Sequence, residues 1–170
     1  MPDTRWKPSV TVAAIIQREA DGRYLLVEEL TPEGLRLNNP AGHLDPAESL
    51  LQAVVRECLE ETARHFTPTA LLGVYQARML RPAHDALPAE DFTYLRFAFV
   101  GTVGEAEPGR ALDSPIVRTL WLSADEIQAS TDRHRSPLLW RCIADHLAGQ
   151  RFGLAAVQAH PSVWQPISLG

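Results

Sequence analysis

The sequence predicts an α/β protein of one domain, in which a mixed β-sheet carries helices on both faces. Two observations lead to this class. Segments typical of β-strands lie on both sides of one strongly patterned helix, and two further helical segments come late in the chain. The 170 residues, of which 45% are hydrophobic, are enough for a single core.

The first predicted element is a buried strand over residues 10–16, where apolar and β-branched residues run almost without a break. The Asp21-Gly22 pair predicts a tight turn into a returning strand over residues 24–29, so that the two strands form a hairpin. Residues 30–39 contain a proline, a glycine and two asparagines, which predicts a loop, and the PAGH stretch that follows predicts a turn.

A helix is predicted from about Pro46 to the region of Arg64. Asp45 suits the N-cap, Pro46 the first helical position and Glu48 the third, which completes a capping box. One face of this helix is apolar and is expected to pack on the core. Its members are Leu51, Val54, Val55, Cys58 and Thr62.

The second half of the chain is expected to hold three strands and two helices. The strands are predicted at residues 71–77, 92–102 and 117–122, with long loops at 78–91 and 104–114. Ser123 opens a short helix with a capping pattern, and a last helix covers residues 138–147 before Gly149. Residues 150–170 form a tail that could dock on the domain, reach a partner subunit or be disordered.

Composition excludes several classes of function. A formal net charge of -5 argues against nonspecific binding of nucleic acid or of an anionic membrane. Cys58 and Cys142 lie in apolar helical contexts and show no zinc-ligand spacing, so we expect two buried free thiols. The N-terminus lacks an apolar signal core, and no apolar run approaches membrane-spanning length, which predicts a soluble cytoplasmic protein. Monomer and homodimer both stay open.

The predicted central helix has a second, acidic face, which we expect to be exposed. Glu57, Glu60 and Glu61 crowd within one turn of it. Like charges at that distance repel unless a cation neutralises them, and oxygen ligands suit Mg2+ or Mn2+ rather than zinc. From the cluster alone, an ordinary solvated helix face is the alternative.

The spacing of charged residues around that face resembles a known family. Gly42 is followed after five residues by Glu48, and after seven more by Arg56-Glu57 and then Glu60-Glu61. This pattern is similar to the box of the Nudix hydrolases at each charged position, and it departs from the box only at its end. Ala63 stands where the family has glycine, and Arg64 where it has an apolar residue. The resemblance implies the Nudix fold, an α/β/α sandwich, over residues 1–149.

The same resemblance implies roles for residues of the box. Glu57 is expected to activate water, although some family members take the base from a later loop. Arg56 either orients Glu57 or simply pairs with Glu60 one turn away. Glu48 either caps the helix or joins the network around the metal. The implied ligands of Mg2+ or Mn2+ are Glu57, Glu60, Glu61, Glu48 and the carbonyl of Ala41.

Residues outside the box supply further candidates. Asp113 is a candidate ligand or base, or else a turn residue beside Pro115. Arg96 and Tyr94, on the alternating strand, are candidates for substrate binding, with cross-strand pairing as the alternative. Glu105 and Glu107 are further candidates, and Arg78, Arg81 and His84 in the long loop are expected to be surface residues.

Segments around the box narrow the expected substrate. Between residues 7 and 147 they look like the NudJ-type phosphatases of the family. This likeness implies hydrolysis of nucleoside di- and triphosphates, or of a pyrimidine pyrophosphate of thiamine synthesis, with no nucleic-acid or membrane partner. Two alternatives remain: an ADP-ribose or dinucleotide pyrophosphatase of the same fold, and a nucleotide sensor that has lost catalysis.

Overall fold

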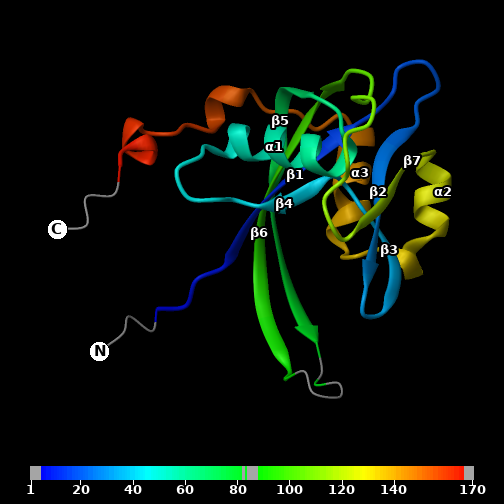
Figure 1. Cartoon of the computed structure of the whole chain (residues 1–170), viewed down its shortest axis with the longest axis horizontal. Helices are drawn as coiled ribbons and strands as arrows, with labels where there is room; N and C mark the ends of the chain where they lie inside the picture. The colour runs from blue at the N-terminus through cyan, green and yellow to red at the C-terminus, as the bar shows by residue number, and fades with distance from the viewer. Residues whose placement is uncertain (1–4, 82, 84–87, 167–170) are drawn as a thin grey trace.

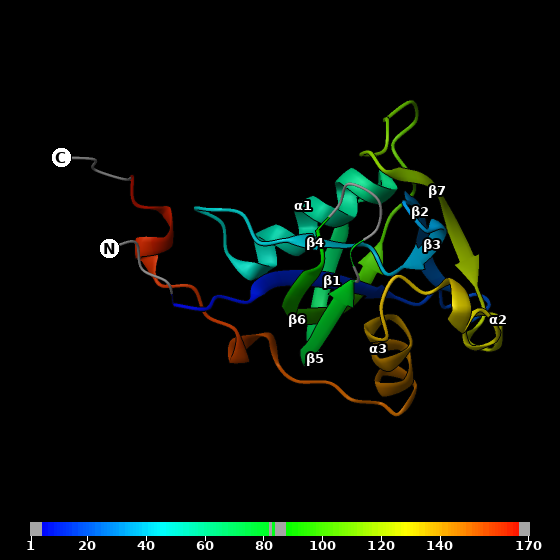
Figure 2. The same cartoon turned by 90° about the horizontal axis from the view of Figure 1, so that it is seen from below.

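The computed structural model describes residues 5–81, 83 and 88–166 and confirms the α/β class. Two β-sheets form its centre, and helices lie on either side of the larger one (Figure 1). Seen at right angles, α1 (Leu50–Thr62) and α3 (Leu138–Leu147) lie on opposite sides of this sheet (Figure 2). The architecture is therefore the predicted α/β/α sandwich.

The larger sheet is mixed, as predicted. Its four strands run in the order β4 (Ala41–His43), β1 (Ser9–Ile16), β6 (Glu90–Val103) and β5 (Phe66–Arg81). β1 pairs in parallel with β6 and antiparallel with β4. Its alternate side chains serve different cores: Val12 and Ala14 pack toward α1, whereas Ala13 and Ile15 pack toward α3. Burial on both faces explains why β1 is apolar throughout.

The smaller sheet corrects two predictions. It consists of β3 (Gly34–Asn38), β2 (Tyr24–Thr31) and β7 (Ile116–Leu122), all antiparallel. The predicted hairpin of β1 with β2 is wrong, because both edges of β2 are occupied by β3 and β7, and only a bridge between Gln17 and Tyr24 remains. The loop predicted over residues 30–39 is also wrong, since its second half is β3, and the expected PAGH turn contains strand β4.

Helix α1 begins later than predicted. Ser49, not Asp45, is its N-cap, and the capping box joins Ser49 to Gln52. Ala47 has a positive φ of 64°, which keeps the preceding turn out of the helix. At the other end Ala63 adopts the left-handed conformation, φ 56°, that the family's glycine would take. Alanine pays about 1 kcal/mol for that conformation relative to glycine.

The loop predicted over residues 78–91 is strand at both of its ends. β5 continues to Arg81 and β6 starts at Glu90, so the two form a long ribbon that projects from the body of the domain (Figure 1). Arg78 lies opposite Thr93 and forms an exposed ion pair with the nearby Asp91 at 2.7 Å. His84 lies outside the described residues.

Both late helices are confirmed. α2 (Ala124–Ala129) has Ser123 as N-cap with Glu126 completing the box, and α3 ends before Gly149, whose φ is 82°. Short 3-10 turns complete the chain at Thr131–Arg133, Leu154–Ala156 and Pro161–Trp164. Both cysteines are buried free thiols, as predicted.

Of the three possibilities for the tail, docking holds for residues 150–166. Phe152 exchanges two backbone hydrogen bonds with Leu71 of β5, at 2.8 and 2.9 Å. Trp164 donates its indole N–H to Gln52 in the first turn of α1, at 2.8 Å. Among the described residues, no helix is long and apolar enough to span a membrane.

The core contains a titratable pair that predicts a pH dependence of stability. Nδ1 of His146 lies 2.7 Å from the hydroxyl of Tyr24. Burial, with a smaller effect of Arg151, lowers the pKa of His146 to about 4. An unfolded histidine titrates near 6.5, so between these values the unfolded chain binds more protons than the folded one.

The free energy of unfolding should therefore fall as the pH drops from about 7 to about 4, by up to roughly 3 kcal/mol from this group. Urea denaturation across this range would measure the loss. His146→Gln, which stays neutral, should show a shallower pH dependence than the wild type. An unchanged slope in this variant would contradict the assignment.

Candidate active site

One guanidinium organises the acidic residues of the box. Nη1 of Arg56 donates to Glu57 Oε1 at 2.8 Å and to Glu60 Oε2 at 2.9 Å. Nε and Nη2 donate to the two oxygens of Glu48, at 3.0 and 2.7 Å, and Nη2 also reaches the carbonyl of His43 at 2.9 Å. Arg56 therefore pairs with Glu60 and also contacts Glu57, and its role in orienting Glu57 stays a prediction.

Glu57 is held against the backbone of β4. Its side chain is only 14% exposed, so the expectation of an exposed acidic face is wrong at this position. The reason is the strand that covers it: a Cβ added to Gly42 would stand 2.0 Å from the Glu57 carboxyl carbon. Burial raises the pKa of Glu57, while the hydrogen bond from Arg56 acts in the opposite direction.

Glu61 lies deeper and faces the other end of the same strand. The backbone N–H of Ala41 donates to Glu61 Oε2 at 2.8 Å. Burial raises the pKa of Glu61 to about 8, against the effect of this hydrogen bond and with help from the charges of Glu57 and Glu29. Two carboxylates of α1 thus approach β4, Glu57 at Gly42 and Glu61 at Ala41.

Glu48 belongs to the network and not to a helix cap. Its Oε1 accepts from the backbone N–H of Asp45 at 2.7 Å as well as from Arg56. The hydrogen bonds from Arg56 lower the pKa of Glu48. The capping role predicted for it is wrong because α1 starts after it, at Leu50.

The later loop approaches the C-terminal end of α1. The backbone N–H of Asp113 donates to the carbonyl of Glu60 at 3.0 Å, and its own carbonyl accepts from Ile116, so the residue takes part in a turn. Its side chain is exposed, and its role as a ligand or base stays a prediction. Glu107 is occupied by His65 and Arg110, and Glu105 is fully exposed.

The donor chemistry around β4 fits a hard divalent cation. Glu57, Glu60 and Glu61 offer carboxylate oxygens beside the backbone of Ala41 and Gly42, and oxygen donors are those that Mg2+ takes. Within the described part of the chain, no group of three or more His, Cys, Asp or Glu side chains is already arranged to hold a metal ion. Arg56 occupies oxygens of Glu57 and Glu60, so an ion would compete with it for them.

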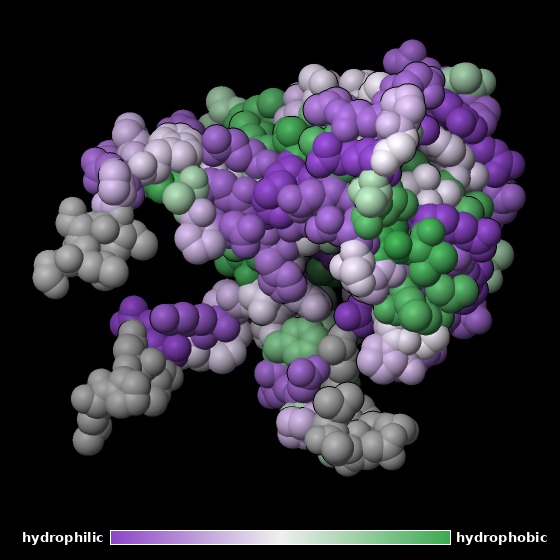
Figure 3. Space-filling view, viewed as in Figure 1, coloured by the Kyte–Doolittle hydropathy of each residue, from purple (hydrophilic) through white to green (hydrophobic). Residues whose placement is uncertain are grey.

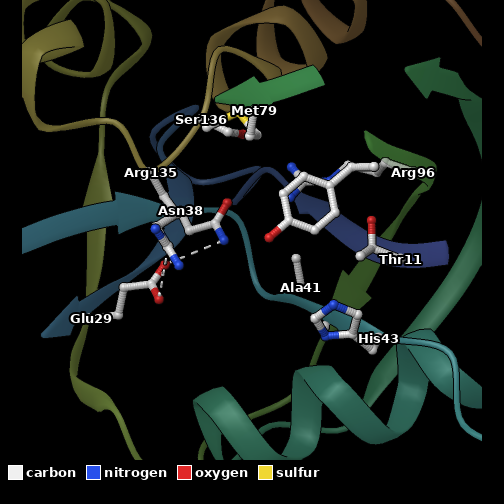
Figure 4. Close-up of a pocket in the computed structure, with 11 residues that line it drawn as sticks. Thr11, Glu29, Asn38, Ala41, His43, Met79, Arg96, Arg135 and Ser136 are labelled. Carbon is white, nitrogen blue, oxygen red and sulfur yellow. Dashed lines mark hydrogen bonds and ion pairs between the residues drawn. The ribbon is translucent and has the colours of Figure 1, made fainter. Parts of the chain in front are cut away.

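A pocket opens on the opposite side of β4 from Glu57. Arg96 and Thr11 enter it from one side, and Glu29, Asn38 and Arg135 from the other, with Ala41 and His43 toward α1 (Figure 4). Seen from outside, the surface over α1 and β4 is hydrophilic (Figure 3). Arg96 lies opposite Thr11 of β1 and Tyr75 of β5, and it is 5% exposed. Tyr94 also lines the pocket, with its ring 6.2 Å from that of His43.

Most residues that line this pocket are not predicted from the sequence. Glu29, Asn38, Arg135 and Ser136 lie on segments expected to be a plain strand, a loop and a helix start. Only the two consecutive asparagines at 38 and 39 give a local signal, because such residues are rare in buried strands. Asn38 is 8% exposed because β3 pairs with β2, and Asn39, which follows β3, is 1% exposed.

Comparison with known proteins shows the family to which this chain belongs. The model of the NUDIX domain matches residues 7–140. The chain belongs to the Nudix hydrolase family. Phosphatase NudJ of Escherichia coli is 35% identical over 152 residues, which cover 89% of this chain and 92% of that protein.

Solved structures agree with this assignment. A NUDIX hydrolase from Nitrosomonas europaea is 47% identical, with a TM-score of 0.78 over 91% of this chain and 98% of that one. An ADP-ribose pyrophosphatase from Streptococcus suis, 16% identical with a TM-score of 0.59, covers 86% of this chain and 96% of its own, and shares the fold. The chain is a Nudix hydrolase. The roles of Arg56, Glu57, Glu60 and Glu61 stay predictions.

The network predicts that Arg56 stabilises the metal-free protein. Arg56→Gln leaves Glu57, Glu48 and Glu60 without their shared cation, and should lower the free energy of unfolding by about 2–4 kcal/mol. Urea denaturation in EDTA would measure the change.

Arg141→Gln is the matched control. Arg141 also pairs with an acid one turn away, Asp145 at 2.9 Å, but its side chain is 66% exposed. Its loss should cost about 0.5 kcal/mol or less. Equal losses in the two variants would show that the network around Arg56 adds nothing to an ordinary surface pair.

Proposed function

We propose that this hydrolase is a metal-dependent phosphoanhydride hydrolase. Its substrates are nucleoside di- and triphosphates, or a related pyrimidine pyrophosphate, and water attacks phosphorus. The observation that carries this proposal is the placement of Glu57 and Glu61 against the short strand β4, with a cationic pocket next to them. The name of the relative from Escherichia coli, a phosphatase, supports removal of phosphate.

Residues of the box would hold the ion. Glu57, Glu60 and Glu61 supply carboxylates, Ala41 its carbonyl, and Glu48 and Asp113 are further candidates. A divalent ion, Mg2+ or Mn2+, supplies neutralisation of the phosphate charge that otherwise repels the attacking water. The donor set of oxygen atoms supports this choice of ion.

Glu57 is the proposed general base. Its carboxylate accepts the proton of the attacking water, and burial raises the pKa of Glu57, which strengthens it as a base. Arg56 holds the carboxylate in place through Oε1 and leaves Oε2 free of any described hydrogen bond. Tyr94 and Arg96 line the adjacent pocket, where they would contact the substrate.

The proposal is tested by a panel of diphosphates assayed with Mg2+, with Mn2+ and in EDTA. Orthophosphate and pyrophosphate release are measured separately. We expect metal-dependent orthophosphate release from nucleoside di- or triphosphates. Preferred cleavage of ADP-ribose or dinucleotides would contradict the proposed substrate class. Tight nucleotide binding without turnover of any compound would show that the protein is a nucleotide sensor.

Glu57→Gln should lower kcat by about 10²–10⁴-fold, because glutamine cannot accept the proton. Glu105→Gln is the control, since the Glu105 side chain is fully exposed at the far end of the loop. Steady-state kinetics and a thermal melt of each variant separate lost chemistry from lost folding. A folded Glu57→Gln enzyme with wild-type kcat would move the base to Asp113 or elsewhere.

A further inference from the structure

The pocket beside β4 contains a concentration of unsatisfied polar atoms. Five buried side-chain atoms that line it have no hydrogen-bond partner: Thr11 Oγ1, Asn38 Oδ1, Arg96 Nε and Nη1, and Ser136 Oγ. The four residues are between 4% and 8% exposed. Buried polar groups are nearly always paired in folded proteins, so a cluster of exceptions around one cavity indicates an absent ligand.

The positive charge of Arg96 indicates that the absent ligand is an anion. A buried guanidinium without an anion is costly, because desolvation is not offset by an ion pair. Arg135, the other cation of the pocket, already faces Glu29 at 3.5 Å. Glu61 and Glu29 act on Arg96 through space, without a described hydrogen bond or ion pair, and Glu61 belongs to the acidic cluster. Two nitrogens of the Arg96 guanidinium, Nε and Nη1, are therefore left without a hydrogen-bond partner.

The position and size of the pocket narrow the ligand further. Ser136 lies just before α3, a helix of 10 residues whose N-terminus has no side-chain cap, and such an end attracts anions. The cavity volume is about 120 Å3. Sites for drug-sized molecules usually measure about 300–1,000 Å3, so a small anion fits and a nucleoside does not. Ala41 and Gly42 form the wall shared with the acidic cluster.

One of the unpaired atoms is a hydrogen-bond acceptor, and it distinguishes anions that carry a proton from anions that do not. Asn38 donates through Nδ2 to Glu29 at 3.5 Å, which leaves Oδ1 as an acceptor facing the pocket. A terminal phosphate has a second pKa of about 6 and can keep one proton to donate to it. An esterified phosphate of a diphosphate diester has no such proton, and neither has sulfate.

We propose that Arg96, Thr11, Ser136 and Asn38 form a small subsite for the free terminal phosphoryl group of the substrate. This inference rests on the proposed hydrolysis of phosphoanhydrides, and it adds the residues that select which phosphoanhydride substrates bind. Substrates that end in a free phosphate fit, whereas ADP-ribose and dinucleotides, whose distal phosphate carries a second group, are excluded by the size of the pocket and by Asn38.

The test uses variants that remove only an unpaired hydroxyl. Ser136→Ala and Thr11→Val should not lower the melting temperature, because neither hydroxyl has a partner to lose. Each should raise KM for a nucleoside diphosphate about tenfold or more, with little change in kcat, since a hydrogen bond to a charged group is removed. Tyr75→Phe is the control, because it removes a buried hydroxyl that does not line this pocket and should leave KM unchanged.

A second measurement does not depend on turnover. Inorganic phosphate, in EDTA at constant ionic strength, should raise the melting temperature of the wild type more than sulfate does. Isothermal titration should show phosphate affinity reduced about tenfold in Ser136→Ala and in Thr11→Val, and unchanged in Tyr75→Phe. Arg96→Lys keeps the charge and should retain part of the binding that Arg96→Met loses.

The outcomes separate this inference from the proposed function. Equal KM changes for a nucleoside diphosphate and for ADP-ribose would overturn the subsite while leaving phosphoanhydride hydrolysis in place. Failure to hydrolyse any diphosphate would overturn the proposed function, and phosphate titration alone would then decide the subsite. Wild-type phosphate affinity in all of the pocket variants, or no preference over sulfate, would also overturn it.

Discussion

The site depends on the hydrogen bonds of a single guanidinium. Arg56 extends from α1 across to the segment that precedes the helix, where it binds Glu48 with two nitrogens and the carbonyl of His43 with one. On its own helix it binds Glu57 and Glu60. One cation thus fixes three carboxylates that would otherwise repel one another, and it ties the loop to the helix in the same step.

The second constraint is the close approach of backbone and carboxylate at β4. This strand has only three residues, held on one side by β1 and continued by hydrogen bonds from Ala14 to Pro40 and from Leu44 to Val10. Its other side meets α1, where Glu57 fills the space of a missing side chain at Gly42 and Glu61 takes the N–H of Ala41. Glycine at position 42 is therefore a requirement of space, not of backbone conformation.

The two sides of β4 differ in how charge is balanced. Around Arg56 every guanidinium nitrogen has an anionic or carbonyl partner. Around Arg96 two nitrogens have none, and neighbouring hydroxyl and amide oxygens are unpaired too. Polar groups in a folded core are satisfied by the protein, by water or by a ligand. This contrast separates the structural cation of the site from the one that is left for a ligand.

Local signals in the sequence were enough for the family and for most elements. The box spacing, the apolar run of β1, the capping box at Ser123 and the glycine after α3 each act within a few residues. They failed where two patterns overlapped, as at the start of α1. The sequence offers two capping patterns there, Asp45-Pro46 with Glu48 and Ser49 with Gln52. The helix starts at the second, because the positive φ of Ala47 keeps the preceding turn out of the helix. They failed also at β2, because which strands pair is not encoded in either strand alone.

By itself, the sequence determined the fold class, the family and the acidic residues of the box, because period, spacing and charge are local properties of the chain. Only the tertiary structure decided that Glu57 is covered, that Glu61 meets Ala41 and that Arg96 shares a pocket with Asn38 and Ser136. These neighbours lie far apart in the chain. Their contacts follow from strand order and from the packing of helices on the sheet, which depend on all the elements together.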